Sequence, residues 1–143
     1  MTRVARETTV RAPLERVFQA LVDPSQRARW VQSVREAGGG EPLAVGRVVE
    51  ARRTLPTSRS QYRMTVLRLE APRLLEMEVE RNGDRVGRAG YELSPAPEGT
   101  RVRAYGEVEL KGFQKLAAPM VSKGMEDELA VDLAGLKRHV ETS

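Results

Sequence analysis

The chain has 143 residues, no cysteine, a single histidine, and 24 lysine and arginine residues against 20 aspartate and glutamate residues. This length suits one domain, expected to span residues 1–143, with a core large enough to need neither disulfides nor a structural metal. The lack of cysteine excludes thiol nucleophiles and iron–sulfur clusters, and a lone His139 excludes a histidine-rich zinc site.

Charge and hydropathy also limit the partners. Twenty of the 24 basic residues are arginine, most of them sit beside acids, and aromatic residues make up only 4%, too few for base stacking. Nucleic-acid binding is therefore not expected. The amino terminus has no apolar core of signal-peptide length, and the longest apolar stretches are too short to cross a membrane. We expect a cytoplasmic protein with no integral membrane contact.

The first part of the chain predicts one strand and two short helices. Residues 4–11 alternate and are rich in Thr and Val, as in a strand. Pro13 then begins a helix, because proline suits the first turn and apolar residues follow at helical spacing. Asp23 and Pro24 begin a second helix, which runs to about Trp30.

Alternating patterns predict six further antiparallel strands. Their expected ranges are residues 31–37, 47–55, 61–69, 75–80, 85–94 and 100–110. Asn82-Gly83 is the strongest hairpin signal, because both central residues of such a turn must accept positive φ. The glutamates of the alternating strand, Glu76, Glu78 and Glu80, are expected to be solvated. The Gly38-Gly39-Gly40 run predicts a flexible turn, since no phosphate-loop Gly-Lys-Ser/Thr follows it.

The last third of the chain is predicted to be helical. Gly112 begins a short apolar turn, and Pro119 either kinks it or begins a longer helix over residues 119–141. Apolar residues recur there every three or four positions, opposite a charged face, so one stripe must lie on the sheet. The sequence thus predicts an α+β fold: a curved seven-stranded antiparallel sheet wrapped around one long C-terminal helix, with two short helices after the first strand.

An ordered set of residues is typical of one superfamily. The set is Ala12-Pro13, Val17-Phe18, Leu21, Asp23-Pro24, Trp30, Gly46, Pro72, Tyr91-Glu92-Leu93, Gly99-Thr100-Arg101-Val102, Gly112, Pro119, Asp132-Leu133, Leu136-Lys137 and Glu141. Over nearly its whole length the chain therefore resembles the START-like (SRPBCC, helix-grip) superfamily and, within it, the polyketide cyclase/dehydrase family. The resemblance implies a cavity between sheet and helix that binds lipids, steroids, hormones or polyketides. It implies no particular activity, because some members are cyclases or dehydratases and others bind.

No catalytic constellation is evident in the sequence. A Ser–His–Asp arrangement would need His139, which lies within the last five residues. Glu126, Asp127 and Glu128 are consecutive on a helix and so do not converge on one site. We expect no catalytic residue, metal or cofactor, and the sequence leaves enzymatic activity open.

Small residues on the inward side of the last strand predict space beneath the helix. Ala104 and Gly106 leave room that is either a ligand cavity or is filled by methionine side chains, Met64, Met77, Met120 or Met125. The two inward tyrosines would present hydroxyl groups to a ligand or simply pack. The expected ligand-binding residues are Tyr62, Met64, Val66, Met77, Val79, Arg81, Tyr91, Leu93, Ala104, Gly106, Met120, Met125 and Leu129.

Two arginines also fall on the inward parity. Arg53 and Arg81 would bind a carboxylate, phosphate or enolate oxygen if buried. Alternatively, both lie at strand ends and extend to solvent, the alternative that the pattern favours. Trp30 is expected to be a packing anchor rather than a ligand contact.

Three functions are compatible with this sequence. The first is binding of a small apolar or amphipathic molecule, lipid-like or polyketide-like, in the cavity. The second is a polyketide-type cyclase or dehydratase, in which a tyrosine or arginine stabilises an enolate. The third is a protein-interaction domain like the chaperone activators of the superfamily, which needs a filled cavity and an exposed apolar patch. The sequence does not distinguish a monomer from a homodimer.

Overall fold

The computed structural model describes residues 2–37, 40–55 and 58–142. Its elements are β1 (Thr2–Val10), α1 (Leu14–Val22), α2 (Pro24–Trp30), β2 (Arg35–Ala37), β3 (Val48–Leu55), β4 (Ser58–Glu70), β5 (Leu74–Arg81), β6 (Asp84–Ala96), β7 (Gly99–Val108), the 3₁₀ helix η1 (Gly112–Ala117) and α3 (Ala118–Glu141). Gly38 and Gly39 of the expected glycine turn lie outside the described residues.

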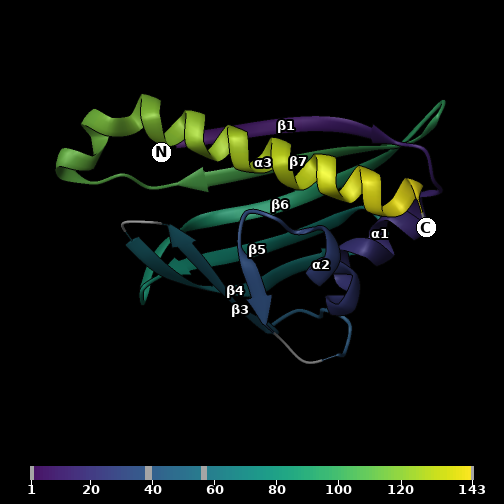
Figure 1. Cartoon of the computed structure of the whole chain (residues 1–143), viewed down its shortest axis with the longest axis horizontal. Coiled ribbons are helices and arrows are strands. Elements are labelled where there is room, and N and C mark those ends of the chain that lie inside the picture. The colour runs from purple at the N-terminus through teal and green to yellow at the C-terminus, as the bar shows by residue number, and fades with distance from the viewer. Residues whose placement is uncertain (1, 38–39, 56–57, 143) are drawn as a thin grey trace.

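The seven strands form one antiparallel sheet in the order β1-β7-β6-β5-β4-β3-β2. The sheet curves beneath α3, which lies along β1 and β7, while α1 and α2 close one end (Figure 1). The predicted helix-grip fold is confirmed. This arrangement gives the sheet an inner face, which faces α3, and an outer face.

Local signals at the amino end act as the sequence predicts. The Asp23 carboxylate accepts a hydrogen bond from the backbone N–H of Ser25 (3.0 Å) and caps α2, and Pro24 occupies its first turn. Hydrogen bonds from Ser25 lower the pKa of Asp23. Trp30 is fully buried, its indole N–H donates to the carbonyl of Ala20 (2.7 Å), and its ring meets that of Tyr91 edge-on. It therefore anchors the end of α2 against α1 and the sheet.

β2 is shorter than the sequence predicts. Instead of residues 31–37, only Arg35–Ala37 pairs with β3. The segment before it is held by Asp132 of α3, which accepts hydrogen bonds from the backbone N–H groups of Gln32 (2.9 Å) and Ser33 (3.0 Å) and from the Ser33 hydroxyl (2.8 Å). These backbone groups bond to the helix instead of to a neighbouring strand, so the strand cannot begin earlier.

The hairpin and the last helix follow the turn residues. Asn82 (φ 50°) and Gly83 (φ 91°) join β5 to β6 in the positive-φ turn expected there. Pro119 lies in the first turn of α3, so it begins the long helix and does not kink it.

The carboxy-terminal half of α3 is fixed to the rest of the molecule. Gly135 lets the helix touch α2, since a Cβ there would lie 2.4 Å from the carbonyl oxygen of Trp30. The Lys137 ammonium donates to the carbonyl of Thr9 (2.7 Å), and Glu141 accepts from the backbone N–H of Arg11 (2.8 Å). Both contacts tie the helix to β1 and to the residue that follows it.

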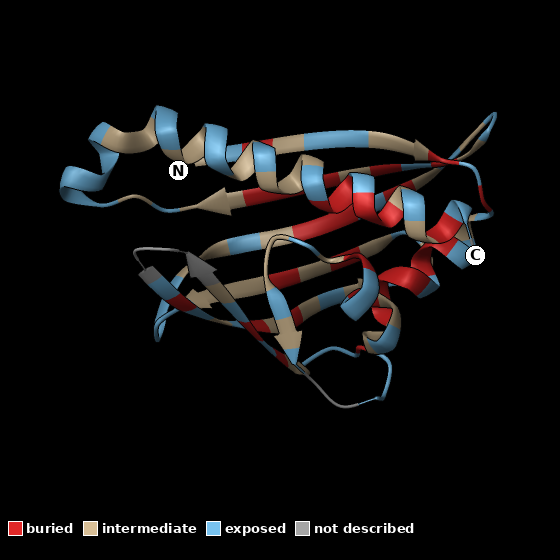
Figure 2. Ribbon diagram, viewed as in Figure 1, coloured by how far each residue is buried: buried red, intermediate tan, exposed pale blue. Residues whose placement is uncertain are grey.

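Burial divides the inner face into two ends (Figure 2). The closed end consists of side chains with no exposed surface: Val10, Leu21, Leu75, Val102 and Leu136. The open end consists of side chains that are only half-buried: Tyr62, Val79, Ala89, Val108, Met125 and Leu129. Along β5 alone the exposed fraction rises from 0% at Leu75 through 2% at Met77 to the half-buried Val79. Packing is thus complete beneath the carboxy-terminal half of α3 and incomplete beneath its amino-terminal half.

One glutamate of the outer face departs from the prediction. Glu76 is not solvated: its side chain is 12% exposed and accepts a hydrogen bond from the Tyr105 hydroxyl. Gly90 makes room for this ring, because a Cβ there would lie 2.5 Å from the hydroxyl oxygen. The guanidinium of Arg3 lies 5.5 Å from the ring centroid of Tyr105. Burial and then Glu76 raise the pKa of this tyrosine.

Candidate functional site

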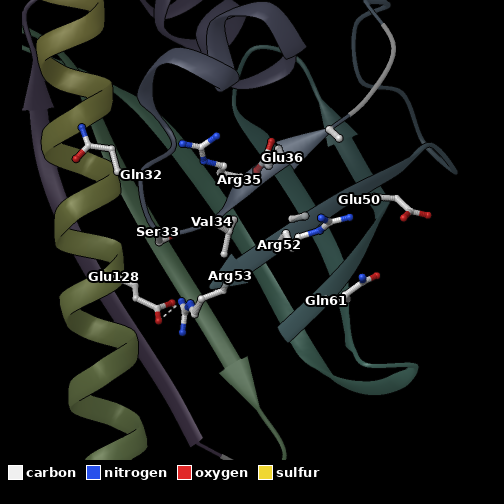
Figure 3. A pocket seen from close by; sticks show the side chains of 12 residues that line it. Gln32, Ser33, Val34, Arg35, Glu36, Glu50, Arg52, Arg53, Gln61 and Glu128 are labelled. Atoms are coloured by element: carbon white, nitrogen blue, oxygen red, sulfur yellow. Dashed lines mark ion pairs between the residues drawn. The ribbon is translucent and has the colours of Figure 1, made fainter. Parts of the chain in front are cut away.

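A cleft of about 970 Å³ lies between α3, β3 and the segment that leads into β2 (Figure 3). The residues that line it are Gln32, Ser33, Val34, Arg35, Glu36, Ala37, Glu50, Ala51, Arg52, Arg53, Gln61 and Glu128. Six of these twelve residues are charged, so the cleft offers polar contacts next to the apolar open end.

An ion pair between Arg53 and Glu128 crosses the cleft (Figure 3). Arg53 lies two residues beyond the buried Ala51 on β3 and points to the inner face, where its guanidinium lies 5.7 Å from the ring centroid of Tyr62. The side chains of Arg53 and Glu128 are 22% and 38% exposed. Of the two alternatives left open for Arg53, the structure therefore shows the inward one, with a carboxylate as its partner.

The two inward carboxylates of α3 have different surroundings. Burial raises the pKa of Glu128, and Arg53 offsets this only in part, while Asp132 raises it further. Asp132, one turn later, is instead held by the three hydrogen bonds from Gln32 and Ser33. Glu128 is thus the less stabilised of the two carboxylates.

The opposite wall of the cleft holds a second arginine–glutamate pair. Arg27 donates through Nε (2.7 Å) and Nη2 (2.6 Å) to the two carboxylate oxygens of Glu36, and its Nη1 donates to the carbonyl of Leu21 (3.0 Å). These side chains are 3% and 7% exposed. Burial alone would lower the pKa of Arg27, but Glu36 outweighs it and the pKa is raised. Glu36 is therefore committed to Arg27, although it lines the cleft.

None of the thirteen residues that the sequence predicts for ligand binding is among those that line this cleft. Six are buried in the core: Met64, Val66, Met77, Tyr91, Leu93 and Ala104. Tyr62, Val79 and Leu129 are half-buried and pack against the core. Arg81 is exposed, with its Nε 3.3 Å from the Ser60 hydroxyl, and Met120 is 79% exposed.

The remaining two predicted residues show how the expected space is used. Gly106 is buried, and a Cβ there would lie 3.0 Å from the terminal methyl of Met125. The space beneath the helix at this point is therefore filled by a methionine, the second of the two alternatives.

Residues 126–128 do diverge as expected, since Glu126 pairs with Arg6 of β1 (3.6 Å) and Glu128 with Arg53 of β3. Sequence reasoning missed that Glu128 and Asp132 share one face of the helix. Their four-residue spacing is the signal that could have predicted two inward carboxylates.

Comparison with known proteins gives the family. A family model described as "Polyketide cyclase / dehydrase and lipid transport" matches residues 1–141. The chain belongs to this family. The resemblance on which the sequence analysis rests is thereby confirmed. No protein of curated function matches the sequence.

Solved structures support the fold of this family member. Protein CV1439 from Chromobacterium violaceum is 16% identical with a TM-score of 0.75, and 99% of each chain is covered. The AHSA1-like protein from Aeromonas hydrophila is 20% identical with a TM-score of 0.72, covering 99% of this chain and 93% of that one. DynU16, from the dynemicin biosynthetic locus, is 20% identical with a TM-score of 0.71, and the match spans 99% of this chain but 48% of that one. Among the described residues, no helix is long and apolar enough to cross a membrane.

Proposed function

We propose that this protein binds a small hydrophobic or amphipathic molecule whose apolar part lies on the open end of the inner face and whose polar part lies in the cleft. The supporting observation is the position of half-buried apolar side chains directly beside a polar cleft. Tyr62 belongs to the open end and touches Arg53, which lines the cleft, and Leu129 follows Glu128 on α3. The two surfaces are therefore continuous.

The energetics of the open end favour an apolar occupant. Burying about 100 Å² of apolar surface stabilises a complex by roughly 2.5 kcal/mol before the costs of association. Met125 covers Gly106 with an unbranched, flexible side chain, which can change rotamer at low cost. A ligand tail can therefore take the place of its terminal methyl without displacing the helix, whose other half is fixed.

The test is to fill the open end. Ala89 lies opposite Gly106 on the inner face, so Ala89→Phe places a ring where the ligand tail is proposed to lie. We expect the affinity for the neutral fluorescent probe phenylnaphthylamine to fall about tenfold or more, while Ala134→Phe, on the exposed side of α3, leaves it within about twofold. Native mass spectrometry of the purified protein would identify a bound species directly. Equal affinities for the probe in both variants would contradict the proposal.

The cyclase or dehydratase function and the protein-interaction function stay predictions. An enolate would be stabilised by Arg53 and the Tyr62 hydroxyl, so turnover lost in Tyr62→Phe with binding retained would favour the enzyme. A partner that binds at the exposed apolar side chains Phe113 (92%), Leu116 (83%) and Met120 (79%) would favour the interaction domain.

A further inference from the structure

We propose that the ligand is an amphipathic anion whose head group pairs with Arg53. Glu128 occupies this place in the structure, and the ligand would displace it. This inference rests on the proposed binding function and names the chemical class of the ligand. It would make Glu128 an internal competitor for the anion site.

Arg53 has donors to spare for such a head group. One terminal nitrogen meets Glu128, and no other described residue accepts a hydrogen bond from its Nε or its other terminal nitrogen. In Arg27 each of the three guanidinium nitrogens has an acceptor. The Tyr62 ring lies against the Arg53 guanidinium and orients it, which leaves the edge of the planar group for an oxyanion.

Glu128 is the carboxylate that a ligand can replace. Its surroundings hold Arg53 from β3 and Asp132 from its own helix, while the N–H groups of Gln32 and Ser33, in the segment before β2, bond to Asp132. Burial disfavours its charged form, as the raised pKa reflects. The partly exposed pair therefore has little net stability to lose when an external anion takes over the arginine.

The rest of the cleft favours an anion once Glu128 moves away. Arg35 and Arg52 line the cleft and lie directly opposite each other across β2 and β3, an arrangement of like charges that costs stability. Glu36 is neutralised by Arg27, which leaves Glu50 as the remaining acid of the lining. Arg35 and Arg52 lie on the opposite parity of their strands from Arg53, so they add positive charge to the cleft without facing the same group as Arg53.

The anion site on Arg53 and the apolar open end are adjacent, so one ligand can occupy both. An anion on Arg53 lies beside the Tyr62 ring, and the open end continues from that ring to Val79 and Leu129. A carboxylate, sulfonate or phosphate joined to a short apolar body would therefore bridge the cleft and the open end. A neutral molecule with the same body would use the open end alone.

Two fluorescent probes with one aromatic skeleton separate these contributions. Anilinonaphthalene sulfonate carries a permanent negative charge, whereas phenylnaphthylamine is its neutral counterpart. Both are titrated into the wild type, Arg53→Met, Glu128→Gln and, as the matched control, Glu126→Gln, which breaks the neighbouring ion pair between α3 and β1. Thermal unfolding establishes that each variant is folded.

We expect the Arg53 and Glu128 variants to change only the affinity for the sulfonate probe. Arg53→Met should weaken it about fivefold or more, and Glu128→Gln should strengthen it about two- to fivefold, the range of a partly exposed ion pair. The neutral probe and the Glu126→Gln control should stay within about twofold. In the wild type, sulfonate affinity should also rise as the pH falls and Glu128 takes up a proton, and this rise should be absent in Glu128→Gln.

The outcomes separate the two proposals. If the neutral probe binds but Arg53→Met affects both probes equally, or if Glu128→Gln weakens the sulfonate, the anion site is overturned and the binding function stands. If neither probe binds any folded variant, the binding function itself is overturned, and the anion site with it.

Discussion

Two arginine–glutamate pairs face the same cleft, and each arginine also lies over an aromatic ring. Arg27 and Glu36 are 3% and 7% exposed, and Arg53 and Glu128 are 22% and 38% exposed. The guanidinium-to-ring distances are nearly equal, 5.5 Å to Trp30 and 5.7 Å to Tyr62. An arginine, a glutamate and an aromatic ring thus occur together twice, once in the packed interior and once at the solvent boundary.

Burial and hydrogen bonding decide what each pair can do. The first pair is bidentate and has a third hydrogen bond to a backbone carbonyl, so separating its members would leave a buried charge without compensation. The second is a single contact within reach of water, so either member can be hydrated when they separate. The first pair therefore fixes α2 to β2, and the second can exchange partners.

The largest expected effect comes from breaking the buried pair. Glu36→Gln leaves the Arg27 guanidinium buried without a counter-charge, so we expect the free energy of unfolding to fall by about 3–5 kcal/mol. Glu128→Gln, the same change in the other pair, should alter it by less than about 1 kcal/mol. Urea unfolding of both variants measures the difference, and equal losses would show that the two pairs do not differ in this way.

Truncating one leucine at the closed end and one at the open end compares how tightly the two ends of the inner face are packed. Leu136 is fully buried, so Leu136→Ala should cost about 2–5 kcal/mol through lost burial and the cavity it leaves. Leu129 is only half-buried, so Leu129→Ala should cost about half as much. Thermal or chemical unfolding gives both values. A loss at Leu129 as large as at Leu136 would mean that the open end is packed in solution.

Asp132 marks the boundary between the two ends. Asp132→Ala removes the acceptor for two backbone N–H groups and one hydroxyl, and we expect a loss of about 1–3 kcal/mol. Asp127→Ala removes only an exposed contact with Lys123 and should cost less than about 0.5 kcal/mol. Amide hydrogen exchange at Gln32 and Ser33 should accelerate in the first variant and not in the second.

The smallest effect is a pH dependence. The pKa of Glu128 is raised in the folded protein, which therefore keeps this proton where the unfolded chain has lost it, and the free energy of unfolding falls as pH rises through that range. Discounted for solvent screening, the fall should be less than about 1 kcal/mol. The pKa values of Asp23 and Glu141 are lowered and act with the opposite sign. Both acids remain in Glu128→Gln, so the difference between wild type and variant isolates Glu128.

The sequence predicted the fold well because local signals and the global arrangement agree. Pro13, Asp23 and the Asn82-Gly83 turn each determine the backbone conformation of only a few neighbouring residues. The alternation of apolar residues then shows which strand residues point inward. β2 was predicted too long because a side chain of α3, a hundred residues away, takes its backbone hydrogen bonds. No local pattern contains that information.

The candidate site was harder to predict than the fold. Parity placed Arg53 on the inner face, but only the path of α3 over the curved sheet brings Glu128 to it. Likewise, Ala104 and Gly106 indicated space, and the helix register decides that Met125 occupies the part above Gly106. Which residues line a cleft between distant elements depends on how those elements pack together. The alternation of inward residues along a single strand does not specify that packing.

The contacts that tie the end of α3 to β1 also bear on self-association. β1 and β2 are the two edges of the sheet, and an edge with free backbone groups can recruit a strand from another molecule. β2 has only three residues, which is too short to template a new strand. Near the end of β1, Lys137 occupies the carbonyl of Thr9 and Glu141 the N–H of Arg11. The helix that closes the core therefore also occupies two backbone groups at the end of this edge, and shortening the chain before Lys137 would free both for pairing with another strand.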